Sequence, residues 1–401
     1  MTQQAFNTQD RILMSRRALI KAAAAATASL VGAATMAPGT AMAADPPPGQ
    51  ASPPTVITNP PRQFGPDAPP NQYPDPDVLT IDSQFGKYAV FNSPIQRLWT
   101  GALWSEGPAW SSEGRYLLWS DVGGNIQYRW LQDDGRVTAM RTPSNNSNGN
   151  TFDFQGRQLS CQDFFRRVVR WELDGSMTVI ADSFNGKKLN SPNDIVPHPD
   201  GSIWFTDPPY GDSLFEGQPD TGGRVNPAIG APDGGGLTRQ LPNSIYRVDK
   251  GGRIDLVTDE VEDPNGLCFS PDYKTLYVCN TGAGPGDTKG GPGNILAYDV
   301  SGDNKVANRR VFTDMMVDGV HCGPDGLRAD VDGNLWCSSN GPLGYSGVLV
   351  YTPQGKLIGR IRLPEVCANL SFGGLKRNRL FMTASASLYA VYVNTQGAAP
   401  G

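Results

Sequence analysis

Short apolar runs joined by turn residues recur along this chain. The clearest copy places Asn193-Asp194 before the run Ile195-Val196, continues through a Pro-Asp-Gly turn at 199–201, and ends in a second apolar run at 203–205. Two apolar runs joined by such a turn predict a β-hairpin. The arrangement occurs six times, in copies that begin at Glu106, Asn150, Asn193, Asn265, Asp325 and Asn369.

The segments after each hairpin also alternate like strands. A third strand-like run follows all six hairpins, and a fourth follows five of them. The copies begin 44, 43, 72, 60 and 44 residues apart, and periods of about 40–50 residues with four strands each are typical of propeller blades. The longest interval contains a Gly/Pro-rich insertion, 211–242, which predicts a loop over one face.

The sixth copy lacks a fourth strand of its own, and an unassigned strand-like segment, 95–100, precedes the first copy. Pairing these two would leave no open sheet edge. We therefore predict an all-β, six-bladed β-propeller with four-stranded blades, closed by this N-terminal strand. A two-sheet sandwich is the alternative, but it does not explain six copies of one pattern.

The first 76 residues differ in composition from the rest. Arg16-Arg17 precede an apolar run at 22–36, and Ala41-Met42-Ala43 offers a small-residue cleavage site. Residues 1–43 therefore predict a cleaved twin-arginine signal, used by the twin-arginine translocation machinery to export a periplasmic protein. A membrane anchor is the alternative, which the short, interrupted run disfavours. Proline-rich residues 44–76 predict an extended linker, leaving 77–401 as the propeller.

Charge and cysteine content exclude several functions. The net charge is −5, and no basic stripe is present to bind nucleic acid or to hold the protein stably on a membrane. The six cysteines are predicted to be mostly buried thiols, with Cys268 and Cys279 as the best candidates for a disulfide. Because no Cys-x-x-Cys occurs, zinc-thiolate and dithiol redox sites have no support.

The residues that begin the six copies are the candidate site. In a propeller, the first strand of each blade lines the axis, so these residues converge at one mouth. They are all Glu, Asp or Asn, although turns alone would also accept Gly and Ser. An oxygen-rich cage of net charge −2 suits Ca²⁺ first, with Mg²⁺, Mn²⁺ or Zn²⁺ as alternatives.

Four motifs resemble those of the gluconolactonase/regucalcin (senescence marker protein) family, closest to its bacterial gluconolactonase branch: Glu106-Gly107-Pro108, Ser191-Pro192-Asn193-Asp194, Pro264-Asn265-Gly266-Leu267 and Pro324-Asp325-Gly326-Leu327. The similarity extends over about residues 104–393. It implies a six-bladed propeller with one catalytic metal in the axial tunnel. It also implies that Glu106, Asn193, Asn265 and Asp325 are the metal ligands and that a lactone such as gluconolactone is the substrate.

Two stretches depart from the family pattern. The segment 161–165 reads Cys-Gln-Asp-Phe-Phe where the bacterial branch has Cys-Glu-His, and Ser191 stands where regucalcins carry a substrate-binding arginine. Both departures bear on which lactone fits. The two histidines, His198 in a hairpin turn and His321 in a loop, do not predict a catalytic dyad, and no Gly-x-Ser-x-Gly elbow occurs.

These residues predict a metal-dependent hydrolase of carboxylic ester bonds. Asp325 is the expected general base. Glu106 is the alternative base, although its expected role is to supply negative charge and to fix the geometry of the metal site. Asn150, Asp194 and Asn369 are expected to bind substrate hydroxyls or to orient the ligands. Two alternatives stay open: the same scaffold acting on another lactone, ester or phosphotriester, and a non-catalytic binding propeller.

Overall fold

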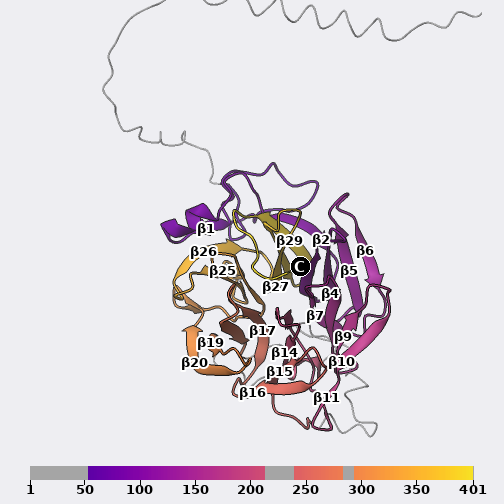
Figure 1. Ribbon diagram of the computed structural model, residues 1–401. Helices are drawn as coiled ribbons and strands as arrows, with labels where there is room; N and C mark the ends of the chain where they lie inside the picture. Colours follow the sequence, from indigo (N-terminus) through magenta and orange to yellow (C-terminus); the bar gives the residue numbers. More distant parts are fainter. Residues whose placement is uncertain (1–52, 213–238, 283–292, 401) are drawn as a thin grey trace, which may run out of the picture. The chain divides into compact units, whose positions relative to one another are not determined.

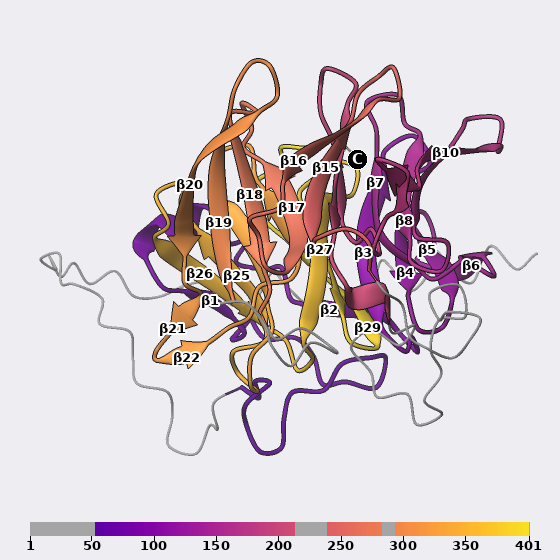
Figure 2. The ribbon, with the colours of Figure 1, turned by 90° about the horizontal axis from the view of Figure 1, so that it is seen from below.

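The computed structural model describes residues 53–212, 239–282 and 293–400. Six antiparallel sheets surround a common axis, which confirms the six-bladed propeller (Figure 1). The first strands of neighbouring blades contact one another in a closed ring, in the order β3, β7, β13, β17, β23, β27 and back to β3. Seen from the side, the inner strands β3, β17 and β27 run between the outer strands β10 and β20 (Figure 2).

The blades follow one another along the chain. The first comprises β3 (Ser105–Ser111), β4 (Tyr116–Asp121), β5 (Ile126–Leu131) and β6 (Val137–Arg141). The second comprises β7 (Ser147–Phe152), β8 (Gln158–Gln162), β9 (Arg167–Trp171) and β10 (Met177–Ala181). The third comprises β13 (Ile195–Pro197), β14 (Ile203–Asp207), β15 (Ser244–Val248) and β16 (Ile254–Thr258).

The second half of the ring repeats this order. The fourth blade comprises β17 (Pro264–Phe269), β18 (Thr275–Asn280), β19 (Asn294–Val300) and β20 (Val306–Thr313). The fifth comprises β23 (Leu327–Ala329), β24 (Leu335–Ser339), β25 (Gly347–Tyr351), β26 (Leu357–Arg362) and, at its outer edge, β1 (Val78–Thr80). The sixth comprises β27 (Cys367–Gly373), β28 (Arg379–Ala384), β29 (Ser387–Tyr392) and β2 (Gln96–Thr100).

Burial follows the position of a strand in its blade. The strands β14, β24 and β28 are buried along their whole length because neighbouring blades cover both of their faces, whereas β20 exposes much of its length. Large aromatic side chains fill the space between blades. Trp110 of the first blade, for example, stacks on Phe381 of the sixth with ring centroids 5.8 Å apart. The core is therefore a set of interfaces between blades rather than one central cluster.

The ring closes as the sequence predicts. Strand β2 pairs antiparallel with β29 and supplies the fourth strand of the last blade, with Gln96 opposite Ala390 and Thr100 opposite Ser387. This closure leaves the outer edge of β29 paired rather than exposed to solvent.

The proline-rich stretch differs from the expected linker. Within the described residues 53–76, the Val56 side chain is 1% exposed, and its backbone N–H donates to the buried Asp77 carboxylate at 3.2 Å. Arg62 binds Asp75 at 2.5 Å, and Arg362 of the fifth blade binds Asp77 at 3.0 Å. Residues 53–76 therefore belong to the same compact unit as the blades, and the sequence missed this because isolated charges among prolines resemble a solvated linker.

The cysteines are buried free thiols in the described part of the chain, as predicted. The candidate disulfide between Cys268 and Cys279 does not form. Cys268 lies opposite Tyr277 in the β17–β18 pairing, so the two cysteines are not a directly facing pair.

Two further expectations concern segments that the structure covers incompletely. The expected signal, 1–43, and most of the 211–242 insertion lie outside the described residues. Where the chain is described, it contains no helix with the length and apolarity needed to cross a membrane.

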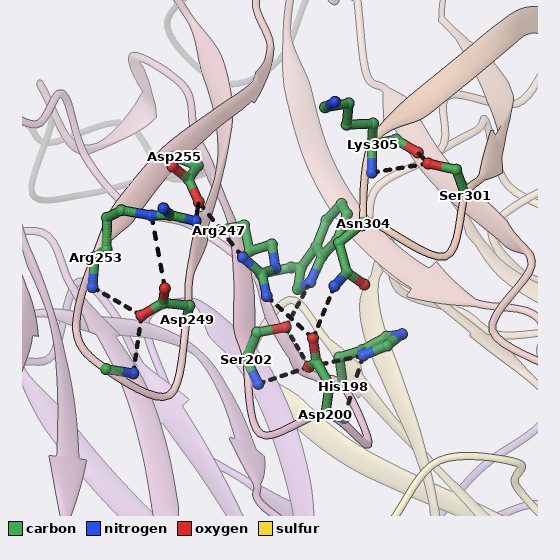
Figure 3. A network of polar contacts seen from close by, with 12 residues as sticks. His198, Asp200, Ser202, Arg247, Asp249, Arg253, Asp255, Ser301, Asn304 and Lys305 are labelled. Atoms are coloured by element: carbon green, nitrogen blue, oxygen red, sulfur yellow. Dashed lines mark hydrogen bonds and ion pairs between the residues drawn. The ribbon is translucent and has the colours of Figure 1, made fainter.

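The predicted hairpin turns are held by polar contacts (Figure 3). Gly201 adopts a positive φ of 86° in the turn between β13 and β14, where its N–H donates to His198 O at 2.9 Å. Asp200 accepts from Asn304 Nδ2 at 2.8 Å, pairs with Arg247 at 3.0 Å and lies 2.8 Å from His198 Nδ1. His198 thus belongs to a structural network between turns.

Candidate active site

The starts of the six inner strands meet around the axis. Backbone hydrogen bonds join equivalent positions of neighbouring blades: Asn193 O accepts from Gly149 N at 2.7 Å, and Asp325 O accepts from Gly266 N at 2.9 Å. In the same way, Ala368 O accepts from Gly326 N at 2.8 Å. These bonds define one level of the tunnel, the oxygen ring, which consists of Glu106, Asn148, Asn193, Asn265, Asp325 and Ala368.

A glycine after the ring residue permits this close approach in four of the blades. A Cβ atom on Gly107 would lie 2.1 Å from Asn148 O, which is far inside van der Waals contact. Strands β3, β7, β17 and β27 also have an irregular register near this level. Bulges of this kind commonly re-aim side chains next to active sites.

In two blades, the residue that lies at the level of the ring differs from the predicted one. In the second blade the ring residue is Asn148, not Asn150, and in the sixth it is Ala368, not Asn369. Hydrophobic patterning could not fix the register within a bulged strand. The dyad Asn148-Gly149 nevertheless repeats Glu106-Gly107, Asn265-Gly266 and Asp325-Gly326, and this signal could have identified Asn148.

Asn150 is a structural residue in this geometry. Its side chain is fully buried and its Nδ2 donates to Gly107 O and to Ser120 Oγ, both at 2.9 Å. Its Oδ1 accepts from Gln127 Nε2 at 2.8 Å. With its amide engaged by protein on both sides, Asn150 joins the first two blades and does not bind substrate hydroxyls.

Asn369 orients a ring carboxylate. Its Nδ2 donates to Glu106 Oε2 at 3.2 Å, while its Oδ1 accepts from Leu370 N at 2.8 Å. Glu106 Oε2 also accepts from Gly107 N at 2.7 Å. Both of these hydrogen bonds end on Oε2, so Gly107 and Asn369 together fix this oxygen of the carboxylate.

The two ring carboxylates lie close enough to repel each other. Burial, and then the charge of Asp325, raise the pKa of Glu106 well above its usual range. The Asp325 side chain is also buried, and Asn340 Nδ2 approaches its Oδ2 at 3.5 Å. A positive charge at this level would relieve the repulsion between the two carboxylates.

The ring offers oxygen donors only. Glu106 and Asp325 contribute carboxylates, and Asn148, Asn193 and Asn265 contribute amides, all of them nearly buried. The described residues contain no cluster of three or more His, Cys, Asp or Glu side chains arranged to hold a metal. The ring instead combines two carboxylates with amide oxygens. A hard divalent cation accepts both kinds of oxygen as ligands.

Asp194 follows the ring residue Asn193 but faces the interior. It is fully buried and forms a two-pronged ion pair with Arg328, at 3.1 Å to Nη1 and 3.4 Å to Nη2. It also accepts from Ile195 N at 2.9 Å. Asp194 is therefore occupied by protein partners and is not placed to bind substrate. Sequence patterning did not single out Arg328, because one arginine within a strand carries no motif.

The departures at Ser191 and 161–165 lie together beside the ring. Ser191 Oγ donates to Pro208 O at 2.7 Å and accepts from Gly211 N at 2.9 Å. A Cβ on Gly211 would lie 2.9 Å from Asp163 Cβ. Ser191 thus fixes the turn after β14. Phe165, two residues after Asp163, is 42% exposed.

The histidines do not form a catalytic dyad. His198 lies in the turn that ends β13, whereas Asn193 precedes the opposite end of that strand. His321 Nε2 is 2.7 Å from Gly293 O. His198 thus belongs to the network around Asp200, and His321 contacts the loop before β19.

The chain matches a known family and several of its members. Residues 104–386 match the family described as "SMP-30/Gluconolactonase/LRE-like region". A gluconolactonase of Zymomonas mobilis is 28% identical over 326 residues, which are 76% of this chain and 83% of the relative. Regucalcin of Xenopus laevis is 26% identical, over 70% of this chain and 82% of its own.

A solved structure supports the same relationship. The structure of a gluconolactonase from Xanthomonas campestris superposes with a TM-score of 0.65 at 32% identity. The match covers 83% of this chain and 98% of that chain.

Proposed function

Because this chain belongs to the SMP-30/gluconolactonase/LRE-like family, we propose that it is a divalent-cation-dependent lactonase that opens a sugar-acid lactone, such as gluconolactone, to the free acid. The observation that carries the proposal is the oxygen ring, in which Glu106 and Asp325 are buried together among amide oxygens. Two mutually repelling buried carboxylates cost folding free energy unless a cation or a bound proton compensates them, and a divalent cation compensates both at once.

The ring residues suit a hard cation. Glu106, Asn193, Asn265 and Asp325 would hold it, and Asn148 is a further amide at the same level. Ca²⁺ is the favoured cation because it accepts carboxylate and amide oxygens in flexible geometry, with Mg²⁺, Mn²⁺ and Zn²⁺ as alternatives. When bound, such a cation supplies a Lewis acid for the lactone carbonyl and lowers the pKa of water.

The two carboxylates would have different roles, one in binding the cation and one in proton transfer. Glu106 is fixed through Oε2 by Gly107 and Asn369, so it is suited to hold charge and geometry. We assign Asp325 as the general base that accepts the proton of the attacking water. The ring amides would bind and orient, since a neutral amide does not accept a proton at working pH.

The substrate class is tested with a panel of esters. We expect the purified protein to hydrolyse gluconolactone and related sugar lactones faster than aliphatic lactones, linear esters or a phosphotriester. Acid release followed in a pH-stat measures each rate directly. Preference for a linear ester or a phosphotriester would assign the scaffold to another reaction, and no hydrolysis of any compound would leave a binding propeller.

We further propose that the protein is exported to the periplasm through Arg16-Arg17. Changing both arginines to lysine should leave precursor in the cytoplasm, because the twin-arginine pathway recognises the pair rather than its charge. Cell fractionation measures the distribution, with Arg11→Lys as the matched control outside the pair. Normal export of the double variant would show that another signal directs the chain.

A further inference from the structure

A buried ion pair, Asp194 with Arg328, lies next to the oxygen ring. Asp194 of the third blade directly follows the ring residue Asn193, and Arg328 lies three residues after the ring residue Asp325 in the fifth. The pair spans the fourth blade between them, whose Leu267 N lies 3.4 Å from Asp194 Oδ2. Arg328 Nη1 additionally donates to Leu327 O at 2.7 Å.

The pair borders two different environments, since Asp194 adjoins the ring residue Asn193 and Arg328 lines a cavity. On one side is the ring of carboxylates and amides. On the other is a largely apolar cavity lined by Arg328 itself together with side chains from several blades and the C-terminal segment, among them Trp110, Phe152, Phe269, Phe372 and Ala398. Arg328 therefore lies at the boundary between an oxygen-rich and an apolar compartment.

Packing alone does not explain a charged pair at this position. Two charges that are removed from water lose hydration free energy, and their mutual attraction offsets this loss only narrowly. Apolar residues of similar volume often give a protein of equal stability. The tunnel could have been closed with leucine and methionine. The charge of the pair is the property that an apolar replacement would lack.

The charges of the pair and of the ring act on one another. A Cβ atom on Gly149 would lie 2.9 Å from Asp194 Oδ1, so this carboxylate lies against the backbone of the second blade, beside the ring residue Asn148. Arg328 Nη1 lies 3.1 Å from the other oxygen of the same carboxylate. The pair is thus in contact with the level of the tunnel that carries Glu106 and Asp325.

We propose that Arg328 sets the charge of the cation site: by neutralising Asp194, it leaves the net −2 of Glu106 and Asp325 that matches a divalent ion. Arg328 is a positioning residue, since it acts through Asp194 and not on the substrate. The inference rests on the proposed function, because it requires that the ring binds a cation.

The test is a double-mutant cycle read by cation binding. Asp194→Asn keeps the shape of the side chain but leaves the positive charge of Arg328, which arginine does not give up. The ring and pair then sum to −1, and Ca²⁺ affinity should fall by about 10–10³-fold, the Coulomb effect of one charge within about a nanometre. Asp194→Asn combined with Arg328→Met restores −2, and affinity should recover to within about threefold of the unchanged protein.

Calorimetric titration of chelator-stripped protein with Ca²⁺ measures each affinity. Asp77→Asn is the matched control, because Asp77 is equally buried and paired with arginine but lies at the fifth blade's outer edge. It should lower the melting temperature without changing Ca²⁺ affinity. A double variant that binds as poorly as Asp194→Asn would overturn the charge role and leave a purely structural pair.

A second series keeps the inference testable if Asp194→Asn does not fold. Arg328→Lys preserves the charge, so the ratio of Ca²⁺ to Tb³⁺ affinity of this variant should match that of the unchanged protein. Arg328→Met removes the charge, and the preference should shift toward Tb³⁺ by about tenfold or more. An unchanged preference in Arg328→Met overturns the inference alone, whereas absence of any Ca²⁺ binding by the unchanged protein overturns the proposed function and the inference with it.

Discussion

Asp325→Asn is expected to lower lactone turnover by ~10²–10⁴-fold, the usual effect of losing a general acid–base group. The substitution retains the size and one oxygen of the side chain but removes its charge and its ability to accept a proton. Added cation should not restore this loss, since the missing step is proton transfer. The measurement is kcat for gluconolactone at increasing cation concentration.

Two comparisons separate chemistry from cation binding in this experiment. Asn193→Ala and Asn265→Ala remove neutral ring oxygens, so excess cation should restore part of their activity. Asp318→Asn, at an exposed aspartate, should behave like the unchanged protein. Full recovery of Asp325→Asn at high cation would limit its role to ligation and move the base to Glu106 or to a water network.

Deletion of residues 1–100 should abolish cooperative unfolding. The deletion removes β2, whose pairing with β29 closes the sixth blade, and exposes an unpaired edge that favours aggregation. Deletion of residues 1–52 should leave the melting transition intact, since the compact unit begins at Pro53. Thermal unfolding followed by circular dichroism, with light scattering for aggregation, distinguishes the two.

A third truncation tests the segment that packs ahead of the blades. Deletion of residues 1–77 removes the buried Val56 and leaves Arg362 without its Asp77 partner. The free energy of unfolding should fall by about 2 kcal/mol or more, the scale of burying one large apolar side chain. Equal stability of the 1–77 and 1–100 deletions would contradict ring closure by β2.

The repeat of the hairpin pattern was sufficient to predict the propeller and its closure. Each copy carries both local signals, alternation and turn residues, and six copies can satisfy their edges only as a ring. The part that failed, residues 53–76, is held by Arg62, Asp75 and Asp77, whose contacts form across long sequence separations. Such contacts leave no periodic signal.

The site was predictable to the level of the ring but not to the level of each side chain. Glu106, Asn193, Asn265 and Asp325 lie at or just before the starts of the inner strands, where the hairpin pattern predicts them, and their role as cation ligands stays a prediction. Asn150 lies two residues and Asn369 one residue after the ring position of its blade, because a bulge near the ring breaks the two-residue period on which the assignment depends. The hydrogen bond from Asn369 to Glu106 nevertheless agrees with the expectation that Asn369 orients a ring residue. The ion pair of Asp194 was not predicted, because its partner, Arg328, comes from another blade.

The most direct test of the account is lactone turnover by chelator-stripped protein, with cations restored one at a time. We expect gluconolactone hydrolysis to fall to the uncatalysed rate after stripping, and to return when Ca²⁺ binds in a one-to-one complex. Stripped Glu106→Gln should not recover to the same extent at the same Ca²⁺ concentration. Undiminished hydrolysis by protein shown by elemental analysis to carry no metal would contradict the account.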